Sequence, residues 1–162
     1  AVKLLQPRNY AKRHGATPYG DDELPRGWTA GLAPAGRLDG DSTGLLVFTA
    51  DGIVAKQLIA PDCDMEKEYM IGFNGVATPE SLDRLRHGLH LDGRELRPAQ
   101  VERDGAHSLR FILREGRRRQ IRRMCKMVGL EVTSLHRIRI GKVRLGGLDE
   151  STFRFLREGE EF

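Results

Sequence analysis

Apolar positions along the chain mark short segments with two periods, one typical of strands and one typical of helices. Leu45–Thr49 is a nearly continuous apolar run, the pattern of a buried strand. Asp51 or Thr49 can then cap a helix that begins at Gly52 and continues to about Ala60. This part of the chain therefore predicts a loop, a strand and a helix in succession.

The middle of the chain continues this alternation. Lys67–Asn74 and Leu109–Leu113 have the apolar and β-branched content of strands. Between them, Thr78 is a favourable N-cap and Pro79 suits a first helical turn, so we expect a helix that ends at Gly88. The pattern predicts a strand, a helix and a further strand.

A third predicted helix is amphipathic. Ile121, Met124, Cys125 and Val128 recur at the i, i+3, i+4, i+7 spacing of one helix face, and Gly129 is a stop signal. We expect that face to pack inward while the arginines between these positions project elsewhere.

The remaining segments complete the fold class. Glu131–Ile140 and Val143–Leu145 favour two strands joined around Gly141, and Ser151–Leu156 favours a last strand. Residues 1–32 predict a short strand followed by loops, because turn residues interrupt any period. Strands outnumber helices and several are separated by short turns. We therefore expect an α+β fold with a central mixed, largely antiparallel sheet flanked by helices and loops.

Length and composition fit one globular domain, since the chain has 162 residues, 39% hydrophobic and 31% charged. No apolar run approaches the ~20 residues of a membrane helix, and the N-terminus lacks the layout of a signal peptide. We therefore expect a cytoplasmic monomer that is not associated with a membrane. Cys63, Cys125 and the five histidines show no metal-ligand or redox spacing, which predicts reduced thiols and no metal site.

Charge is distributed unevenly along the chain. Twelve basic and two acidic residues lie between Arg110 and Arg144, a local net charge of +10, whereas the rest of the chain carries −6. A basic stretch on an acidic body is typical of a protein that binds phosphates. The alternative, a solvated helix face, would need compensating acids, which are scarce here. The pattern favours nucleic acid as the partner.

A carboxylate in a glycine-bounded loop is the first candidate for chemistry. Asp39 follows Arg37 and Leu38 and precedes the predicted strand, where a rigid loop would hold it at a surface. A loop aspartate that only makes a turn hydrogen bond is the alternative. Asp41 and Asp51 compete for the role, because two neighbouring carboxylates can also serve glycoside hydrolysis. Spacing alone leaves these alternatives open.

Residues 36–52, GRLDGDSTGLLVFTADG, resemble the catalytic signature GRLD-x-x-[ST]-x-GL…T-x-[DN]-G of the RsuA-type ribosomal RNA pseudouridine synthases. Glu66–Tyr69 is similar to that family's K-x-Y strand, and Glu115–Met124 is similar to its EGRNRQ[IV]RRM segment. Arg137–Leu148 is similar to its R[IVT]RIG…LG.L ending. The resemblance covers most of the chain and implies that residues 1–162 form a catalytic domain of this family, with up to two lobes.

The resemblance implies a reaction and a set of site residues. Asp39 would be the catalytic aspartate, a nucleophile or base in isomerising a uridine, whose C–N bond breaks before the uracil turns and rejoins through C5. No cofactor is implied. Tyr69 would stack on the uracil, with a core tyrosine as the alternative. Arg122 would pair with Asp39 and keep it ionised, with a phosphate contact as the alternative.

The uridine would have to be flipped out of folded RNA. This costs free energy, which contacts with the phosphates must offset. The residues expected to contact RNA are Arg37, Lys67, Arg118, Arg119, Gln120, Arg123 and Lys126.

The sequence also departs from the family. Gln6 stands where the family has a lysine, and Arg118 where it has an asparagine. Many members of the family also carry an N-terminal S4-type RNA-binding domain; none is visible in residues 1–162, and whether the full protein has one upstream stays open. The sequence of Gln120–Cys125 resembles most the branch of the family that modifies large-subunit RNA, which favours that RNA as the target.

Two other classes of function compete with the enzyme. A non-catalytic RNA-binding module would gain nothing from the carboxylate of Asp39 near phosphates. A glycosidase or nuclease using Asp39 with Asp41 would need an acid partner or a metal set that cannot be assembled from the sequence.

Overall fold

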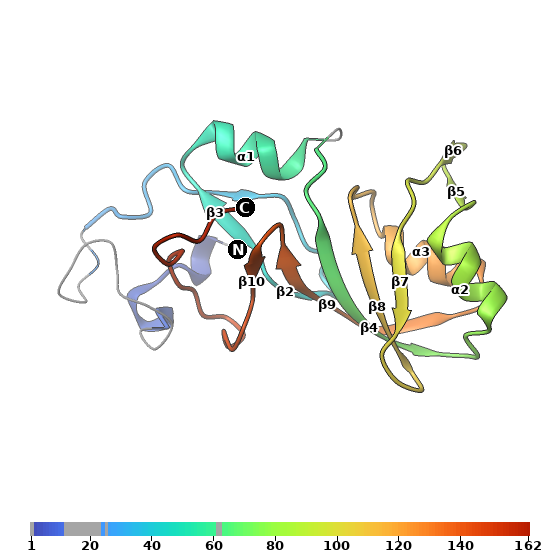
Figure 1. Cartoon of the computed structure of the whole chain (residues 1–162). Coiled ribbons are helices and arrows are strands. Elements are labelled where there is room, and N and C mark those ends of the chain that lie inside the picture. The colour runs from blue at the N-terminus through green and yellow to red at the C-terminus, as the bar shows by residue number, and fades with distance from the viewer. Residues whose placement is uncertain (1, 12–23, 25, 61–62) are drawn as a thin grey trace.

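A twisted sheet runs through the centre of the molecule, with α2 and α3 against one end and α1 over the other (Figure 1). The computed structural model describes residues 2–11, 24, 26–60 and 63–162. The elements, in chain order, are η1 (Val2–Leu4), η2 (Pro7–Asn9), β1 (Ala33–Ala35), β2 (Thr43–Gly44), β3 (Val47–Thr49), α1 (Gly52–Ile59), β4 (Lys67–Asn74), α2 (Pro79–Arg86), β5 (His90–Leu91), β6 (Arg94–Glu95), β7 (Gln100–Arg103), β8 (Ser108–Leu113), α3 (Gln120–Met127), β9 (Glu131–Ile140) and β10 (Val143–Arg144).

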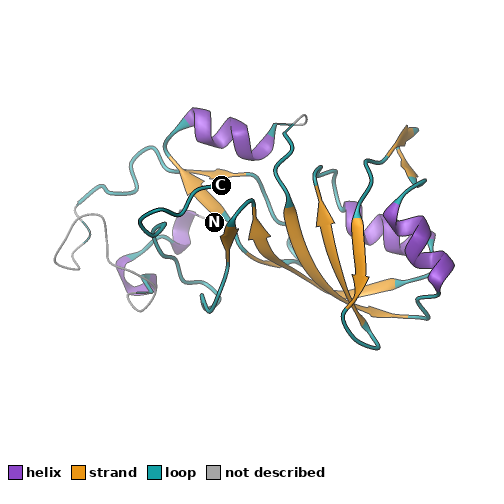
Figure 2. Cartoon of the chain, in the orientation of Figure 1, coloured by secondary structure: helices purple, strands orange, loops and turns teal. Residues whose placement is uncertain are grey.

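The central sheet has six strands and is mostly antiparallel. Its order is β10-β9-β4-β8-β7, with β2 beside β9. β4 is antiparallel to both β8 and β9, whereas β2 is parallel to β9. Two small ribbons, β1–β3 and β5–β6, lie apart from it (Figure 2). The expected α+β fold with a mixed, largely antiparallel sheet is confirmed.

Side-chain caps begin the first two helices as the sequence predicts. The Asp51 carboxylate accepts hydrogen bonds from the amides of Ile53 and Val54, at 2.7 and 3.3 Å, and starts α1. The Thr78 hydroxyl accepts from the amide of Ser81 at 3.2 Å and starts α2. Both residues satisfy amide groups that a helix N-terminus leaves without partners.

Two hydrophobic clusters hold the fold together. The larger lies where α2 and α3 cover the sheet, and it includes Phe73, Phe111 and Met124. The predicted inward face of α3 is confirmed, since Cys125 is fully buried beside Met124 and burial raises the pKa of its thiol to about 12. The smaller cluster joins α1 to the far end of β9 and comprises Ala35, Leu45, Leu58, Ile140 and Val143. Among the described helices, none has the length and apolar character that a membrane crossing needs.

Two segments at the ends of the chain differ from the prediction. The described part of the opening contains 3-10 turns at residues 2–4 and 7–9 where a strand was expected. Residues 12–23 and 25 of that prediction lie outside the described residues.

The expected last strand, Ser151–Leu156, is also wrong. The segment begins with Ser151 in a turn, at a φ of 60°, and forms a single bridge from Phe153 to Tyr10. Packing of aromatic rings holds it, because Trp28 stacks on Phe153 at 5.0 Å between ring centroids. Aromatic residues therefore mimic a strand pattern, although within the described chain the backbone of this segment bonds to the opening segment only at Phe153, with Asn9 and Ala11.

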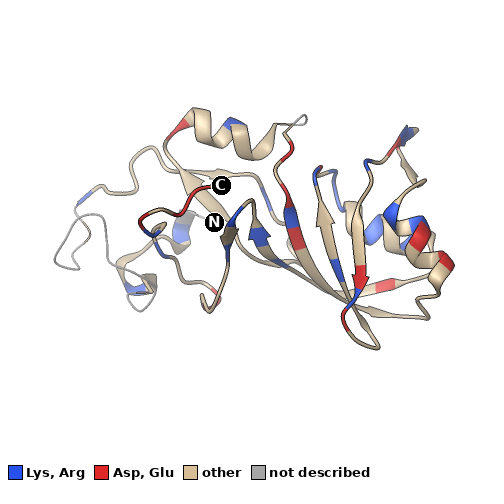
Figure 3. Ribbon diagram, in the orientation of Figure 1, with Lys and Arg blue, Asp and Glu red and all other residues tan. Residues whose placement is uncertain are grey.

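The central strands of the sheet carry both acidic and basic residues (Figure 3). Glu68 is only 2% exposed and binds Arg110 and Arg139. Burial acts to raise the pKa of Glu68, but the hydrogen bonds from these two arginines outweigh it, so the pKa is lowered from 4.5. Glu68 therefore becomes ionised at a lower pH in the folded protein than in the unfolded chain.

We expect Glu68→Gln to lower the free energy of unfolding by about 2 kcal/mol at pH 7, because Arg110 and Arg139 each lose the buried one of their two carboxylate partners. A lowered folded-state pKa stabilises the protein above the unfolded pKa, and this contribution is lost as pH falls through the folded value. The variant should therefore lose less stability than the parent between pH 7 and pH 3. Urea unfolding across this range measures both effects.

Glu102→Gln is the matched control, because Glu102 also binds Arg110 but is 62% exposed. It should change the unfolding free energy by less than about 0.5 kcal/mol. Equal losses for the two variants would contradict the importance of burial at Glu68.

Candidate active site

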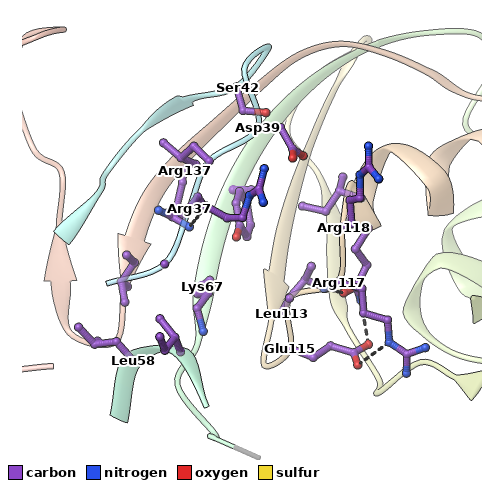
Figure 4. A pocket seen from close by; sticks show the side chains of 18 of the residues that line it. Arg37, Asp39, Ser42, Leu58, Lys67, Leu113, Glu115, Arg117, Arg118 and Arg137 are labelled. Atoms are coloured by element: carbon purple, nitrogen blue, oxygen red, sulfur yellow. Dashed lines mark hydrogen bonds and ion pairs between the residues drawn. The ribbon is translucent and has the colours of Figure 1, made fainter. Parts of the chain in front are cut away.

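A pocket of about 410 Å³ opens where the loop after β1, the C-terminal end of α1, strands β4, β8 and β9, and the loop before α3 come together. All four segments that carry the family resemblance contribute to its wall, although they are far apart in sequence. The lining residues that the sequence analysis proposed as catalytic or RNA-binding are Arg37, Asp39, Lys67, Tyr69, Arg118, Arg119 and Gln120. Figure 4 shows Asp39 and Arg118 facing the pocket from opposite walls.

Asp39 is half-buried and its carboxylate points into the pocket (Figure 4). Its backbone carbonyl accepts from the amide of Ser42 at 3.0 Å, which closes the turn. Within the described part of the chain, no ion pair or hydrogen bond occupies the carboxylate. Its oxygens are therefore available to a molecule that enters the pocket.

Neighbouring carboxylates have other partners. Asp51 caps α1. Asp41 binds Arg119, at 2.8 Å between Oδ2 and Nη2, and this hydrogen bond is the first cause that lowers the pKa of Asp41 below 3.8. A carboxyl group held ionised is a poor proton donor, so the arrangement does not support the two-carboxylate hydrolase alternative.

Backbone pairing with β9 fixes the far side of the Asp39 loop. Thr43 and Gly44 form β2, which pairs in parallel with His136 and Arg137. The amide of Leu45 donates to the carbonyl of Arg137 at 2.8 Å. The hydroxyl of Thr43 and Nδ1 of His136 are hydrogen-bonded at 2.7 Å. The loop is thus attached to the sheet immediately after the catalytic candidate.

Arg137 is a buried cation that sequence reasoning left without a role. It is 4% exposed and lines the pocket beneath the Asp39 loop. Its Nε donates to the carbonyl of Leu45 at 2.7 Å and its Nη1 to that of Arg37 at 3.4 Å, while Nη2 is buried with no hydrogen-bond partner among the described residues. The sequence did contain a signal that Arg137 faces inward: it lies two residues after the apolar Leu135, and alternate residues of a strand share a face.

Tyr69 and Lys67 reach the pocket from the same face of β4. Tyr69 is half-buried. It packs against the larger hydrophobic cluster and also lines the pocket, so it is part of the core and of the candidate site at once. Lys67 donates to the carbonyl of Met65 at 3.3 Å. Burial lowers the pKa of Lys67, and the nearby charge of Arg137 lowers it further.

Residues 114–120 form the opposite wall. Arg118 is exposed and forms no ion pair with any described residue. Gln120 is buried, and its amide accepts from the backbone of Arg117 at 2.9 Å and donates to Glu115 at 2.8 Å. Gln120 therefore orders the loop, and the RNA contact expected of it stays a prediction.

Arg122 does not pair with Asp39 as expected. Its Nε lies 3.3 Å from Oδ2 of Asp41, and its Nη2 donates to the Asp41 backbone carbonyl at 2.7 Å. Its Nη1 donates to the carbonyl of Val132 at 2.9 Å. Arg122 thus acts on the same loop, but through the residue two positions after Asp39.

The remaining basic candidates lie outside the pocket lining. Arg123 forms a two-bond ion pair with Asp92 of the β5–β6 turn, at 2.6 and 2.9 Å. Lys126 is exposed on the last turn of α3. Arg117, by contrast, does line the pocket, and it donates to backbone carbonyls of the same hairpin, among them that of Leu91 at 2.8 Å. Within the described residues, no three side chains of metal-ligating type gather in one place.

Fold and site together define an α+β protein with an available carboxylate in a pocket walled by cations. A profile of the RNA pseudouridylate synthase family matches residues 20–127, and the chain belongs to this family. The resemblance to RsuA-type enzymes found in the sequence is confirmed by the curated relatives.

The ribosomal large subunit pseudouridine synthase B of Pseudomonas aeruginosa is 36% identical over 129 residues, which are 76% of this chain and 33% of that protein. The dual-specificity RNA pseudouridine synthase RluF of Salmonella typhi is 35% identical over 80% of this chain and 45% of its own length. A crystal structure of a pseudouridylate synthase has a TM-score of 0.78 at 30% identity and covers 84% of this chain and 60% of that one. The chain thus spans less than half the length of these curated relatives.

Proposed function

We propose that this chain is the catalytic domain of an enzyme that isomerises a uridine of ribosomal RNA, in the large subunit, to pseudouridine. The observation that carries the proposal is the carboxylate of Asp39, which faces a cation-walled pocket that Tyr69 also lines. Membership of the family and the printed activities of the relatives support the reaction class.

The proposed roles follow the geometry. Asp39 acts as nucleophile or base while the C–N bond of the uridine breaks, and the uracil then turns and bonds through C5. The C5 hydrogen leaves as a proton and N1 gains one, so the reaction is a rearrangement that needs no electrons and, in this proposal, no cofactor. Tyr69 stacks on the flipped base, and Arg37, Lys67, Arg118 and Arg119 hold its phosphates around the pocket.

Further parts of the proposal concern the protein as a whole. Arg123 and Lys126 would contact RNA outside the pocket, and Arg122 would support the reaction by ordering the Asp39 loop. The protein would act as a monomer in the cytoplasm.

Mapping of modified uridines tests the proposal. Large-subunit and small-subunit RNA transcripts are incubated with the purified chain, and carbodiimide treatment followed by primer extension locates pseudouridine. New stops in the large-subunit transcript alone are the expected result. Conversion of only the small-subunit transcript would contradict the target, and no conversion with either the chain or the full protein would contradict the activity.

Arg118 should contribute directly to RNA binding, because it is exposed at the pocket rim and has no acidic partner among the described residues. We expect Arg118→Gln to flatten the slope of log affinity against log salt concentration by about 0.7 to 0.9. Filter binding at several salt concentrations measures the slope. Arg84→Gln, an exposed arginine on α2 away from the pocket, is the charge-matched control and should leave the slope unchanged.

A further inference from the structure

Asp41 has an unusual position for an exposed loop carboxylate, because both of its oxygens bind one arginine. Nη1 and Nη2 of Arg119 donate to Oδ1 and Oδ2 at 3.0 and 2.8 Å. Such paired bonds fix the relative orientation of two groups as well as their distance. Asp41 lies two residues after Asp39, so this contact restrains the turn that carries the catalytic candidate.

Arg122 strengthens the attachment from the next turn of α3. Residues three apart share a helix face, so Arg119 and Arg122 approach Asp41 from the same side. Arg122 binds both the side chain and the backbone carbonyl of Asp41, and it also reaches the carbonyl of Val132 in β9. The Asp39 turn is therefore joined to α3 and, through Arg122, to the sheet.

The backbone of Arg119 provides a second, independent observation. Arg119 is the N-cap of α3 and has a φ of 52°, the left-handed region that side chains other than glycine rarely adopt. Its side chain makes no capping hydrogen bond to the helix. Its guanidinium is instead bound to Asp41, which gives the strained residue a defined orientation at the pocket wall.

We propose that Asp41 is a positioning residue: it holds the Asp39 turn against α3 and keeps Arg119 at the wall of the pocket. The inference rests on the proposed function, in which Asp39 performs the chemistry. Asp41 itself touches no reacting atom, because it does not line the pocket.

The proposal predicts opposite effects on turnover and binding. Without the carboxylate of Asp41, Asp39 loses its restraint and turnover falls. Two arginines are released at the same time and a negative charge is removed near the RNA phosphates, so RNA binds as well as before or more tightly. A merely stabilising surface ion pair would change neither quantity at a temperature where the protein is folded.

Asp41→Asn is the direct test, because it keeps the size of the side chain. We expect kcat on saturating RNA to fall by about tenfold or more, since small displacements of a catalytic group are costly. The dissociation constant for RNA should stay within about threefold of the parent or become smaller. Single-turnover conversion and filter binding measure the two quantities on the same transcript.

Asp83→Asn is the matched control. Asp83 forms an exposed ion pair with Arg86 on α2, and its arginine is 41% exposed, compared with 42% for Arg119. The substitution removes the same charge away from the pocket and should leave kcat within about twofold of the parent.

Arg119 supplies a second line of test that does not depend on Asp41 substitutions. Arg119→Lys keeps the charge but cannot form the paired bonds, so kcat should fall although the charge is preserved. The double variant of Asp41→Asn with Arg119→Lys should be no slower than the slower single variant, because residues that act as a unit are not additive.

Parental kcat for Asp41→Asn, a loss confined to RNA affinity, an equal loss in Asp83→Asn, or additive effects in the double variant would each overturn the positioning role. These outcomes are distinct from failure of the proposed function, in which the parent itself forms no pseudouridine and the inference fails with it.

Discussion

Asp39→Asn should abolish pseudouridine formation, with the single-turnover rate lowered on the order of 10³-fold or more, because the amide is neither a nucleophile nor a base. The fold should be unaffected, since the carboxylate makes no contact within the described structure that the amide would break. RNA affinity should stay within a few-fold of the parent or rise slightly, because a negative charge near phosphate is removed. Primer extension after carbodiimide treatment measures conversion, and filter binding measures affinity.

Asp51→Asn is the control from the same sequence signature. Asp51 caps α1 through its side chain, and asparagine is an equally favourable cap, so this variant should retain parental conversion. If Asp39→Asn converts uridine at the parental rate, another group performs the chemistry. If both variants are inactive, loss of the local fold explains the result better than loss of a catalytic group.

Gly44→Ala should have the largest effect on stability of any single-methyl addition in the Asp39 loop. A Cβ at this position would lie 2.2 Å from the carbonyl oxygen of Arg137 and 2.6 Å from its amide nitrogen. Both atoms belong to the backbone of β9, which cannot move without disturbing the sheet. Gly44 also has a φ of 107°, which residues with a side chain rarely adopt. We expect a loss of at least about 3 kcal/mol and loss of activity.

Gly40→Ala provides the comparison within the same loop. A Cβ on Gly40 would meet no atom within 4 Å, and its φ lies outside the left-handed region. Its melting temperature should match that of the parent, whereas Gly44→Ala should melt several degrees lower. Equal melting temperatures for the two variants would show that β2 does not approach β9 as closely as described.

Local signals in the sequence predict much of the fold. Asp51 and Thr78 cap their helices as expected, and the spacing of Ile121, Met124 and Cys125 identifies the buried face of α3. β7 was not predicted because Val101 is its single apolar residue, so no alternation marks it. The β5–β6 hairpin was not predicted because each strand has only two residues and arginine contacts from α3 and its preceding loop hold it.

The candidate site was predicted in its residues more than in its contacts. The sequence signature places Asp39 and Tyr69 in one pocket, and the structure brings them there. The contacts of Arg122 and Arg137 depend on which backbone carbonyls lie near them after β9 has paired with β2 and β4. Every residue has a backbone carbonyl, so neither composition nor spacing indicates which carbonyls these arginines will bind. Partner choice among several aspartates in one loop is equally a tertiary property, which is why Arg122 was expected to pair with Asp39 and binds Asp41 instead.

Internal ion pairs change how this protein would meet RNA in solution. Arg110, Arg119, Arg123 and Arg139 all have acidic partners in the fold, so much of the +10 counted along the basic segment is compensated before RNA arrives. A compensated surface attracts a polyanion weakly over long distances, and few counterions are displaced at first encounter. Recognition would then depend on a small number of cations at the pocket rim and on the fit of an extruded nucleotide. The approach of RNA would be slow and selective, and strong attraction would begin only at contact.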